Sequence, residues 1–167
     1  MKEHCIFQTA WGWCGIVLQD DRLVATELPV RLHKHIASRI AKNHSDSVEN
    51  DRLMPQLVEA IRGYFDGKKV TFDVPLDLTS QSDFRRRVLQ ACARIPRGQM
   101  ASYADLARAA GSPKAARAAG AAMANNPLPL VVPCHRVIRS DGQLGGFSSP
   151  DGLKQKKDML ELEGAYS

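Results

Sequence analysis

Long apolar runs are missing from this sequence. No stretch approaches the roughly 20 apolar residues that a membrane helix requires, and the opening MKEHCIFQTAWG lacks the apolar run and cleavage pattern of a signal peptide. A cysteine framework is missing too, because Cys5, Cys14, Cys92 and Cys134 follow no regular spacing, which favours free thiols over disulfides. We therefore expect a globular protein of the reducing cytoplasm.

Metal-ligand spacing is also absent. No CxxC pair or comparable arrangement links the N-terminal cysteines and histidines, which are His4, Cys5, Cys14, His33, His35 and His44. Internal repeats and low-complexity tracts are absent as well. We expect no zinc site and no other metal or cofactor.

Positive charge is concentrated in the second half of the chain. The 167 residues carry a net charge of +5, and their 44% hydrophobic content is enough for one domain or two small lobes. Residues 1–83 hold 10 Lys and Arg against 12 Asp and Glu, whereas residues 84–167 hold 13 against 6. The second part is a candidate for binding a polyanion, although a solvated basic face is the commoner meaning of such an excess.

The first 74 residues predict a small antiparallel sheet with two helices. Alternating apolar residues predict strands at 5–9, 13–19 and 23–28, the last two joined by an Asp20-Asp21 turn. A further strand is expected at 70–74. Helical spacing is found in Leu32, Ile36 and Ile40 and again in Leu53, Leu57, Val58, Ile61 and Phe65, with Gly67 as a stop.

The domain boundary is expected where the pattern and the charge change together. Residues 75–82 contain Pro, Thr and Ser without periodicity, and the basic part begins just after them. We assign residues 1–78 to an N-terminal domain and residues 79–167 to a C-terminal domain.

The C-terminal part predicts three helices, of which two form a helix-turn-helix. Asp83 precedes the first, whose apolar face is Phe84, Val88, Leu89 and Cys92, and Pro96 ends it. Ser102 and Asp105 resemble a capping box for a helix over 103–110, which Gly111 stops. Ser112 is expected to cap the next helix, with Pro113 at its first position.

The second helix of this pair, PKAARAAGAAMA, is nearly all Ala and Gly. Its only charges are Lys114 and Arg117, so it can lie close to a DNA groove but has few groups for reading bases. Arg117 stands alone among small residues and could enter the base stack in place of an extruded nucleotide. Simple packing of the alanines into a core is the alternative.

The segment Pro133-Cys134-His135-Arg136-Val137 places a thiol beside an imidazole and a guanidinium. Cysteine reacts as a thiolate, which nearby cations favour. His135, as a sequence neighbour, is expected to reach the sulfur through a water molecule. The alternative is that Cys134 is a buried small hydrophobe and His135 an incidental neighbour.

The C-terminal part resembles the O6-alkylguanine-DNA alkyltransferases, also called methylated-DNA-protein-cysteine methyltransferases. The resemblance rests on PCHRV at 133–137, KAARAAGAAMANNPLPLVV upstream, SYADLA at 102–107, and the GGFS loop and terminal ELEG downstream. The N-terminal part is similar to the family's smaller ribonuclease-H-like lobe in size, in its TAWGW opening and in its order of elements.

The resemblance implies both a fold and a function. The fold is mixed α/β (α+β), with a small ribonuclease-H-like sheet-and-helix lobe and a helical, winged-helix-like lobe that contains the helix-turn-helix. The function is DNA repair by irreversible, single-turnover transfer of the alkyl group from O6-alkylguanine in double-stranded DNA to Cys134. The base would be flipped out through the minor groove by a monomer, and O4-alkylthymine is left open as a second substrate.

The resemblance also implies roles for individual residues. Cys134 is the acceptor, and His135 takes its proton through a water while Glu163 holds the ring, which leaves a resting thiolate and imidazolium pair. Asn126 is a hinge beside the thiolate, and Tyr103 donates toward N3 of the base. Arg117 is the finger, the side chain that enters the base stack, and it shares a DNA-binding surface with Lys114, Ala116, Ala118 and Gly120. The pocket for the flipped base is lined by Met123 and Pro129. Backbone groups of Cys134, Val137 and Ser148 form hydrogen bonds to the base.

One departure from the family pattern bears on Glu163. The chain carries SSPDG between the GGFS loop and the final helix, where the pattern is shorter, so Glu161 is a second candidate partner for His135. Three other functions are alternatives. One is a non-catalytic alkyltransferase-like protein that binds DNA damage, although such a protein would lack the acceptor cysteine. The others are a helix-turn-helix transcription factor and a papain-type hydrolase, whose local signatures are absent.

Overall fold

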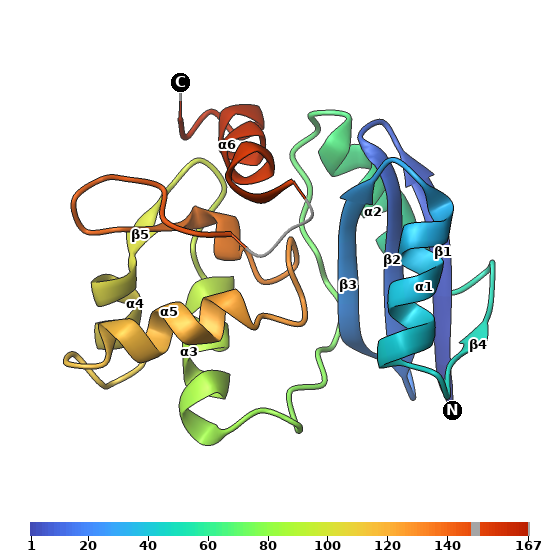
Figure 1. Cartoon of the computed structure of the whole chain (residues 1–167), viewed down its shortest axis with the longest axis horizontal. Coiled ribbons are helices and arrows are strands. Elements are labelled where there is room, and N and C mark those ends of the chain that lie inside the picture. The colour runs from blue at the N-terminus through green and yellow to red at the C-terminus, as the bar shows by residue number, and fades with distance from the viewer. Residues whose placement is uncertain (148–150, 167) are drawn as a thin grey trace. The chain divides into compact units, whose positions relative to one another are not determined.

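The computed structural model describes residues 1–147 and 151–166 (Figure 1). The chain divides into two compact units, Met1–Asp77 and Leu78–Ser167, within one residue of the expected boundary. The units are called here the N-terminal and C-terminal units, and each is described by itself. Within the described residues, no helix is long and apolar enough to cross a membrane.

The N-terminal unit is built on a four-stranded sheet in the order β3-β2-β1-β4. Its strands are β1 (Lys2–Thr9), β2 (Gly12–Gln19), β3 (Arg22–Val30) and β4 (Val48–Glu49). The first three are antiparallel neighbours, as predicted, and β4 pairs in parallel with β1. Asp20 and Asp21 adopt φ values of 50° and 67°, which form the tight turn expected between β2 and β3.

Two helices cover this sheet, α1 (His33–Asn43) and α2 (Pro55–Phe65). Figure 1 shows α1 lying across one face. Its Ile36 and Ile40 pack with Val17 and Ala25 in a buried cluster. Gly15 permits this approach, because a Cβ there would lie 2.9 Å from the Ile36 side chain.

Two predictions for the N-terminal unit are wrong. Residues 70–74 form no strand in the described structure. The segment that follows them makes a single bridge to the edge strand β3, between Leu76 and Leu23. The opposite edge of the sheet is occupied by β4. Leu32 is not on the buried helical face, because it is the exposed N-cap residue of α1. Neither a short apolar run nor a helical period distinguishes residues inside a helix or strand from the residues that flank it.

The C-terminal unit contains α3 (Asp83–Ala93), α4 (Tyr103–Ala109), α5 (Ala116–Ala124) and α6 (Gly152–Leu162). The short strands β5 (Ala101–Ser102) and β6 (Val137–Ile138) pair in parallel. The 3-10 turn η1 (Cys134–Arg136) immediately precedes β6. The predicted mixed α/β class is therefore confirmed, with a sheet-and-helix first unit and a mainly helical second unit.

The start of the helix-turn-helix is as predicted, but the start of its second helix is not. Ser102 accepts from the Asp105 backbone and the Asp105 side chain accepts from the Ser102 backbone, so the capping box begins α4. Ser112 caps no helix: its carbonyl accepts from Ala115 N–H in a turn, and α5 begins only at Ala116. Lys114 therefore lies in this turn.

Candidate active site

Cys134 lies in the C-terminal unit where η1, β6 and the start of α4 come together. It opens η1 directly after Pro133, and its side chain is buried. The β6 strand that follows pairs Val137 with Ala101 and Ile138 with Ser102. Because Ser102 caps α4, this pairing brings Tyr103 at the start of α4 close to the cysteine turn.

Asn126 fastens the segment before Cys134 to the end of α5. Its Nδ2 donates to the Val132 carbonyl over 2.9 Å, and its Oδ1 accepts from the Leu128 N–H, also over 2.9 Å. The Asn126 amide also bonds to the Cys134 thiol, which favours the thiolate. These bonds place Asn126 between the end of α5 and the cysteine.

His135 and Glu163 form a fully buried pair. The Nε2 of His135 lies 2.6 Å from Oε2 of Glu163, and neither side chain is exposed to solvent. Glu161 points elsewhere: its carboxylate lies 3.8 Å from Lys157 Nζ on the surface of α6. The geometry thus favours Glu163 over Glu161 as the partner of His135, even with the longer SSPDG loop.

The buried setting opposes charge on both members of the reactive pair. Burial raises the pKa of the Cys134 thiol, and the Asn126 bond and the charge of Lys156 offset this in part. Burial lowers the pKa of His135, against the opposing influence of Glu163. Burial therefore acts against the resting thiolate and imidazolium pair that the resemblance implies, whereas Asn126 and Lys156 at Cys134 and Glu163 at His135 favour it.

A cavity of about 400 Å³ opens beside the Cys134 sulfur. Tyr103 stands in its wall with a phenol whose pKa is raised by burial, so it stays protonated and able to donate. Gly145, at φ +75°, closes against this ring: a Cβ there would lie 3.1 Å from the Tyr103 hydroxyl. The lining residues are Tyr103, Gly120, Met123, Ala124, Cys134, Arg139, Gly145, Gly146 and Phe147.

Lys156 is a buried cation that the sequence reasoning missed. Its Nζ donates to the carbonyls of Val137 over 2.7 Å and Leu144 over 2.6 Å, and lies over the Tyr103 ring. Burial lowers its pKa to about 8. Lys156 thus joins α6 to both the cysteine turn and the loop that lines the cavity, while its charge favours a thiolate at Cys134.

Helix α5 presents one face to the cavity. Gly120 and Ala124 line the cavity, and Arg117 lies one turn before Gly120 on the same side of the helix. Arg117 and Ala118 are exposed, whereas Ala119 and Ala122 pack inward. Gly120, expected to contact DNA, belongs to the cavity wall.

Two expected contacts with the base do not appear in the described part of this cavity wall. Pro129 and Val137 are not among the described lining residues, and the Val137 carbonyl already accepts from Lys156. Ser148 lies outside the described residues. Arg139 and Phe147 also line the cavity. Arg139 follows β6 and belongs to none of the motifs named above, whereas Phe147 lies in the GGFS motif, which the sequence analysis singled out without giving this residue a role.

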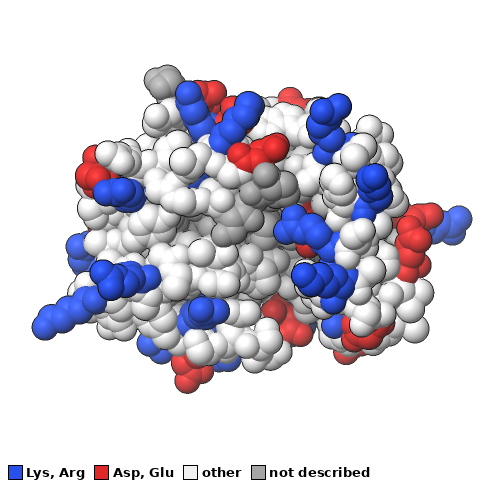
Figure 2. All heavy atoms as spheres, in the orientation of Figure 1, with Lys and Arg blue, Asp and Glu red and all other residues white. Residues whose placement is uncertain are grey.

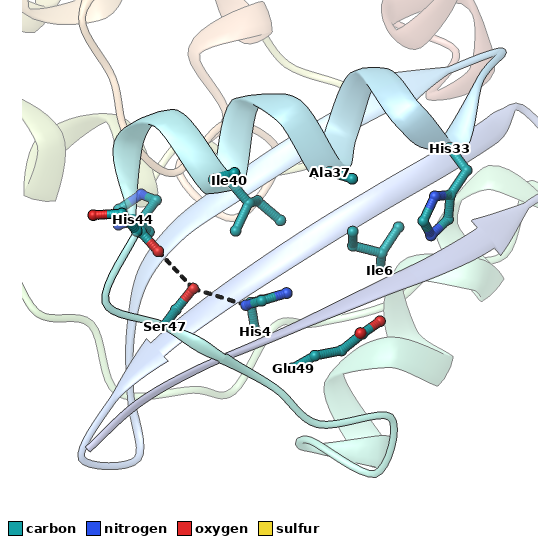
Figure 3. A pocket seen from close by; sticks show the side chains of 10 residues that line it. His4, Ile6, His33, Ala37, Ile40, His44, Ser47 and Glu49 are labelled. Carbon is teal, nitrogen blue, oxygen red and sulfur yellow. Dashed lines mark hydrogen bonds between the residues drawn. The ribbon is translucent and has the colours of Figure 1, made fainter.

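Three of the N-terminal histidines, His4, His33 and His44, line a separate cavity of about 330 Å³ beside α1 (Figure 3). His33 and His44 lie at opposite ends of that helix, and His4 Nδ1 is occupied by the Ser47 hydroxyl at 2.7 Å. Among the described residues, no group of three His, Cys, Asp or Glu side chains could hold a metal ion.

Comparisons with known proteins agree on one family. The model for the 6-O-methylguanine DNA methyltransferase DNA-binding domain matches residues 83–165. A methylated-DNA–protein-cysteine methyltransferase of Methanothermobacter thermautotrophicus is 44% identical over 152 residues, which cover 90% of this chain and 78% of that protein. The corresponding protein of Mycolicibacterium paratuberculosis is 44% identical over 71% of this chain and 70% of its own length.

Solved structures give the same result. The crystal structure of the Mycobacterium tuberculosis O6-methylguanine methyltransferase has a TM-score of 0.81 at 32% identity, covering 100% of this chain and 95% of that one. A structure of that protein in complex with DNA has a TM-score of 0.82 at 31% identity, covering 98% of this chain and 93% of the other.

Proposed function

Because the chain belongs to the O6-methylguanine DNA methyltransferase family, we propose that Cys134 is the residue that accepts the alkyl group. The protein is a methylated-DNA–protein-cysteine methyltransferase, and its C-terminal unit is a DNA-binding domain. The observation that supports Cys134 most strongly is its position in the wall of a cavity, beside the buried pair of His135 and Glu163. Cys92, Cys14 and Cys5 line no such cavity with a histidine partner in the described structure.

The substrate we propose is double-stranded DNA that carries O6-alkylguanine, bound by a monomer of the protein. Arg117 on α5 enters the base stack while the damaged base turns out into the cavity. The small residues of α5 let the helix approach the backbone closely, and few of its side chains can read bases. Binding is therefore tolerant of sequence, and a poorly paired damaged base costs least to extrude.

The transfer itself is a nucleophilic substitution. The Cys134 thiol passes its proton through a water to His135, whose Nε2 is held by Glu163, so that the proton arrives on Nδ1. The sulfur then bonds to the alkyl carbon as the bond from that carbon to O6 breaks. Tyr103 donates a hydrogen bond to the departing guanine, which lowers the cost of its negative charge.

The product explains why each molecule acts once. The thioether on Cys134 offers no leaving group to water, so the thiol is not regenerated. All four cysteines are free in the structure, as an acceptor thiol requires, and we place the protein in the reducing cytoplasm.

The acceptor role is tested by weighing the protein after incubation with a duplex that holds one O6-methylguanine. We expect a gain of one methyl group per molecule and no gain in Cys134→Ala. Cys92→Ala is the matched control, because it removes another buried thiol of the same unit, and it should gain the methyl group normally. A folded parent protein that binds the duplex without gaining mass would contradict the proposal.

A further inference from the structure

Arg139 is the one Lys, Arg, Asp or Glu among the described residues that line the cavity beside Cys134. The rest of the described lining consists of a tyrosine, a cysteine, a methionine, a phenylalanine, glycines and an alanine. The Arg139 side chain is 56% exposed, so its guanidinium lies at the opening of the cavity rather than inside it. A cation in this place suits a ligand whose uncharged part enters the cavity and whose negative charge stays outside.

The backbone and the first part of the Arg139 side chain are held in place. The Arg139 N–H donates to the Gln143 carbonyl over 2.9 Å, and the Arg139 carbonyl accepts from the Gly142 N–H over 3.0 Å, which closes a tight turn. A Cβ on Gly145 would lie 3.4 Å from Arg139 Cγ, so the side chain begins against the cavity wall. The turn therefore fixes where the side chain starts, while its exposed end is free to change partner.

The present partner of the guanidinium is Asp141. Nη2 of Arg139 lies 2.8 Å from Oδ2 of Asp141, whose side chain is 45% exposed, and Oδ1 of Asp141 accepts from the Gln143 N–H over 3.0 Å. An ion pair this exposed to solvent is weak, so another anion can replace the carboxylate at little cost. A phosphate is a suitable replacement, because a guanidinium can donate two parallel hydrogen bonds to it.

The proposed reaction brings phosphates to this place. A nucleotide whose base has turned into the cavity remains joined to its strand by a phosphate on either side. Because the base occupies the cavity, its sugar and these two phosphates stay at the opening. Contacts to phosphates fix the position of a nucleic acid on a protein without reading its sequence, which suits a DNA-binding helix with few base-reading side chains.

We propose that Arg139 binds one of the two phosphates that flank the flipped nucleotide, and that the phosphate replaces Asp141 as the partner of the guanidinium when the base enters the cavity. This inference rests on the proposed function, in which the cavity receives O6-alkylguanine from DNA. Arg139 thus contributes to transfer from DNA but not to transfer from a free base.

The test compares an ordinary duplex that holds one O6-methylguanine with two duplexes in which one flanking phosphate, 5′ or 3′, is an uncharged methylphosphonate. The second-order rate constant for transfer is measured for the parent and for Arg139→Gln, which loses the charge but keeps the Cγ beside Gly145. We expect the parent to lose about 10-fold on one modified duplex, and Arg139→Gln to lose about 10-fold on the ordinary duplex. On that modified duplex, Arg139→Gln should lose little more, because the contact is already absent.

Arg108→Gln is the matched control. Arg108 is also an exposed arginine of the C-terminal unit that pairs with a nearby aspartate, Asp105, over 2.9 Å, but it does not line the cavity. Its variant should keep the full sensitivity of the parent to the modified phosphate. Asp141→Asn gives a second readout, since it should speed transfer from the ordinary duplex more in the parent than in Arg139→Gln, where no guanidinium is released.

The proposal is overturned if Arg139→Gln is as sensitive as the parent to both modified duplexes, because Arg139 then binds neither phosphate. Equal slowing on the duplex and on free O6-benzylguanine would also overturn it, since Arg139 would then shape the cavity. An equal gain from Asp141→Asn with and without Arg139 would overturn the exchange of partners. A failure of the proposed function appears separately, as no methyl group gained by the parent from the ordinary duplex.

Discussion

Glu163 sets how strong a base His135 can be. Its carboxylate raises the pKa of the imidazole, while burial and the neighbouring cations lower it. Sequence reasoning could indicate Cys134 and His135 because they are adjacent in PCHRV, and it indicated Glu163 only through the resemblance of ELEG to the family pattern, with Glu161 as the alternative. It could not indicate Lys156, because that side chain matters only through its complete burial near Cys134. It could not indicate the contact between Arg136 and Glu163 either. Each of these features depends on where α6 packs.

Replacing Glu163 by Gln tests this balance at the residue scale. Without the carboxylate, the pKa of His135 falls further, so the imidazole becomes a weaker base and transfer at pH 7 slows by roughly 10-fold or more. The acid side of the pH–rate profile should move to lower pH. Glu161→Gln is the control, because its carboxylate lies on the surface beside Lys157. Equal slowing in Glu163→Gln and Glu161→Gln would contradict the assignment of Glu163 as the partner of His135.

At the scale of elements, the pairing of β5 with β6 places Tyr103 and Cys134 in one wall. Both strands are two residues long, too short for any alternation to show in the sequence. The capping box of α4 was predictable because Ser102 and Asp105 carry it locally. The late start of α5 was not, since a Ser-Pro pair suits both a helix start and the turn that the chain adopts here.

The exposed face of α5 yields a prediction for Arg117. Arg117→Ala removes the side chain that we propose fills the gap left by the flipped base, so transfer from duplex DNA should slow by about 10-fold, equivalent to about 1.4 kcal/mol. Transfer from free O6-benzylguanine needs no base flipping and should change little. Parallel assays on the two substrates measure this difference in rate. Equal slowing on both substrates would contradict the proposal that Arg117 enters the base stack. Lys114→Ala, in the turn before α5, is the companion variant and should affect only the duplex, through weaker binding.

At the scale of the whole molecule, charge distinguishes the two parts of the chain. Residues 84–167 carry 13 Lys and Arg against 6 Asp and Glu, while residues 1–83 carry 10 against 12. Blue side chains outnumber red ones on the face drawn in Figure 2. The sequence could indicate a polyanion partner because the net charge of a segment does not depend on how the chain folds. The cavity beside Cys134 could not be predicted, because residues distant in the sequence form it.

This charge predicts a strong salt dependence for repair of DNA. Each phosphate contact releases counterions, so affinity for undamaged duplex should fall by a factor of about ten or more between 50 and 200 mM salt. Fluorescence anisotropy of a labelled duplex measures it, and the rate with free O6-benzylguanine should stay nearly constant over the same range. Salt-insensitive binding to the duplex would contradict an electrostatic DNA interface.

The central claim is that one particular sulfur receives the alkyl group. Cys92 is the stringent comparison, because it is also buried and close enough for its charge state to couple to that of Cys134. Peptide mapping after reaction with a duplex bearing a deuterated O6-methylguanine locates the label directly. We predict one deuterated methyl group per protein, on the peptide containing Cys134. Label on the Cys92 peptide, or an unlabelled protein that still binds the damaged duplex, would contradict the account.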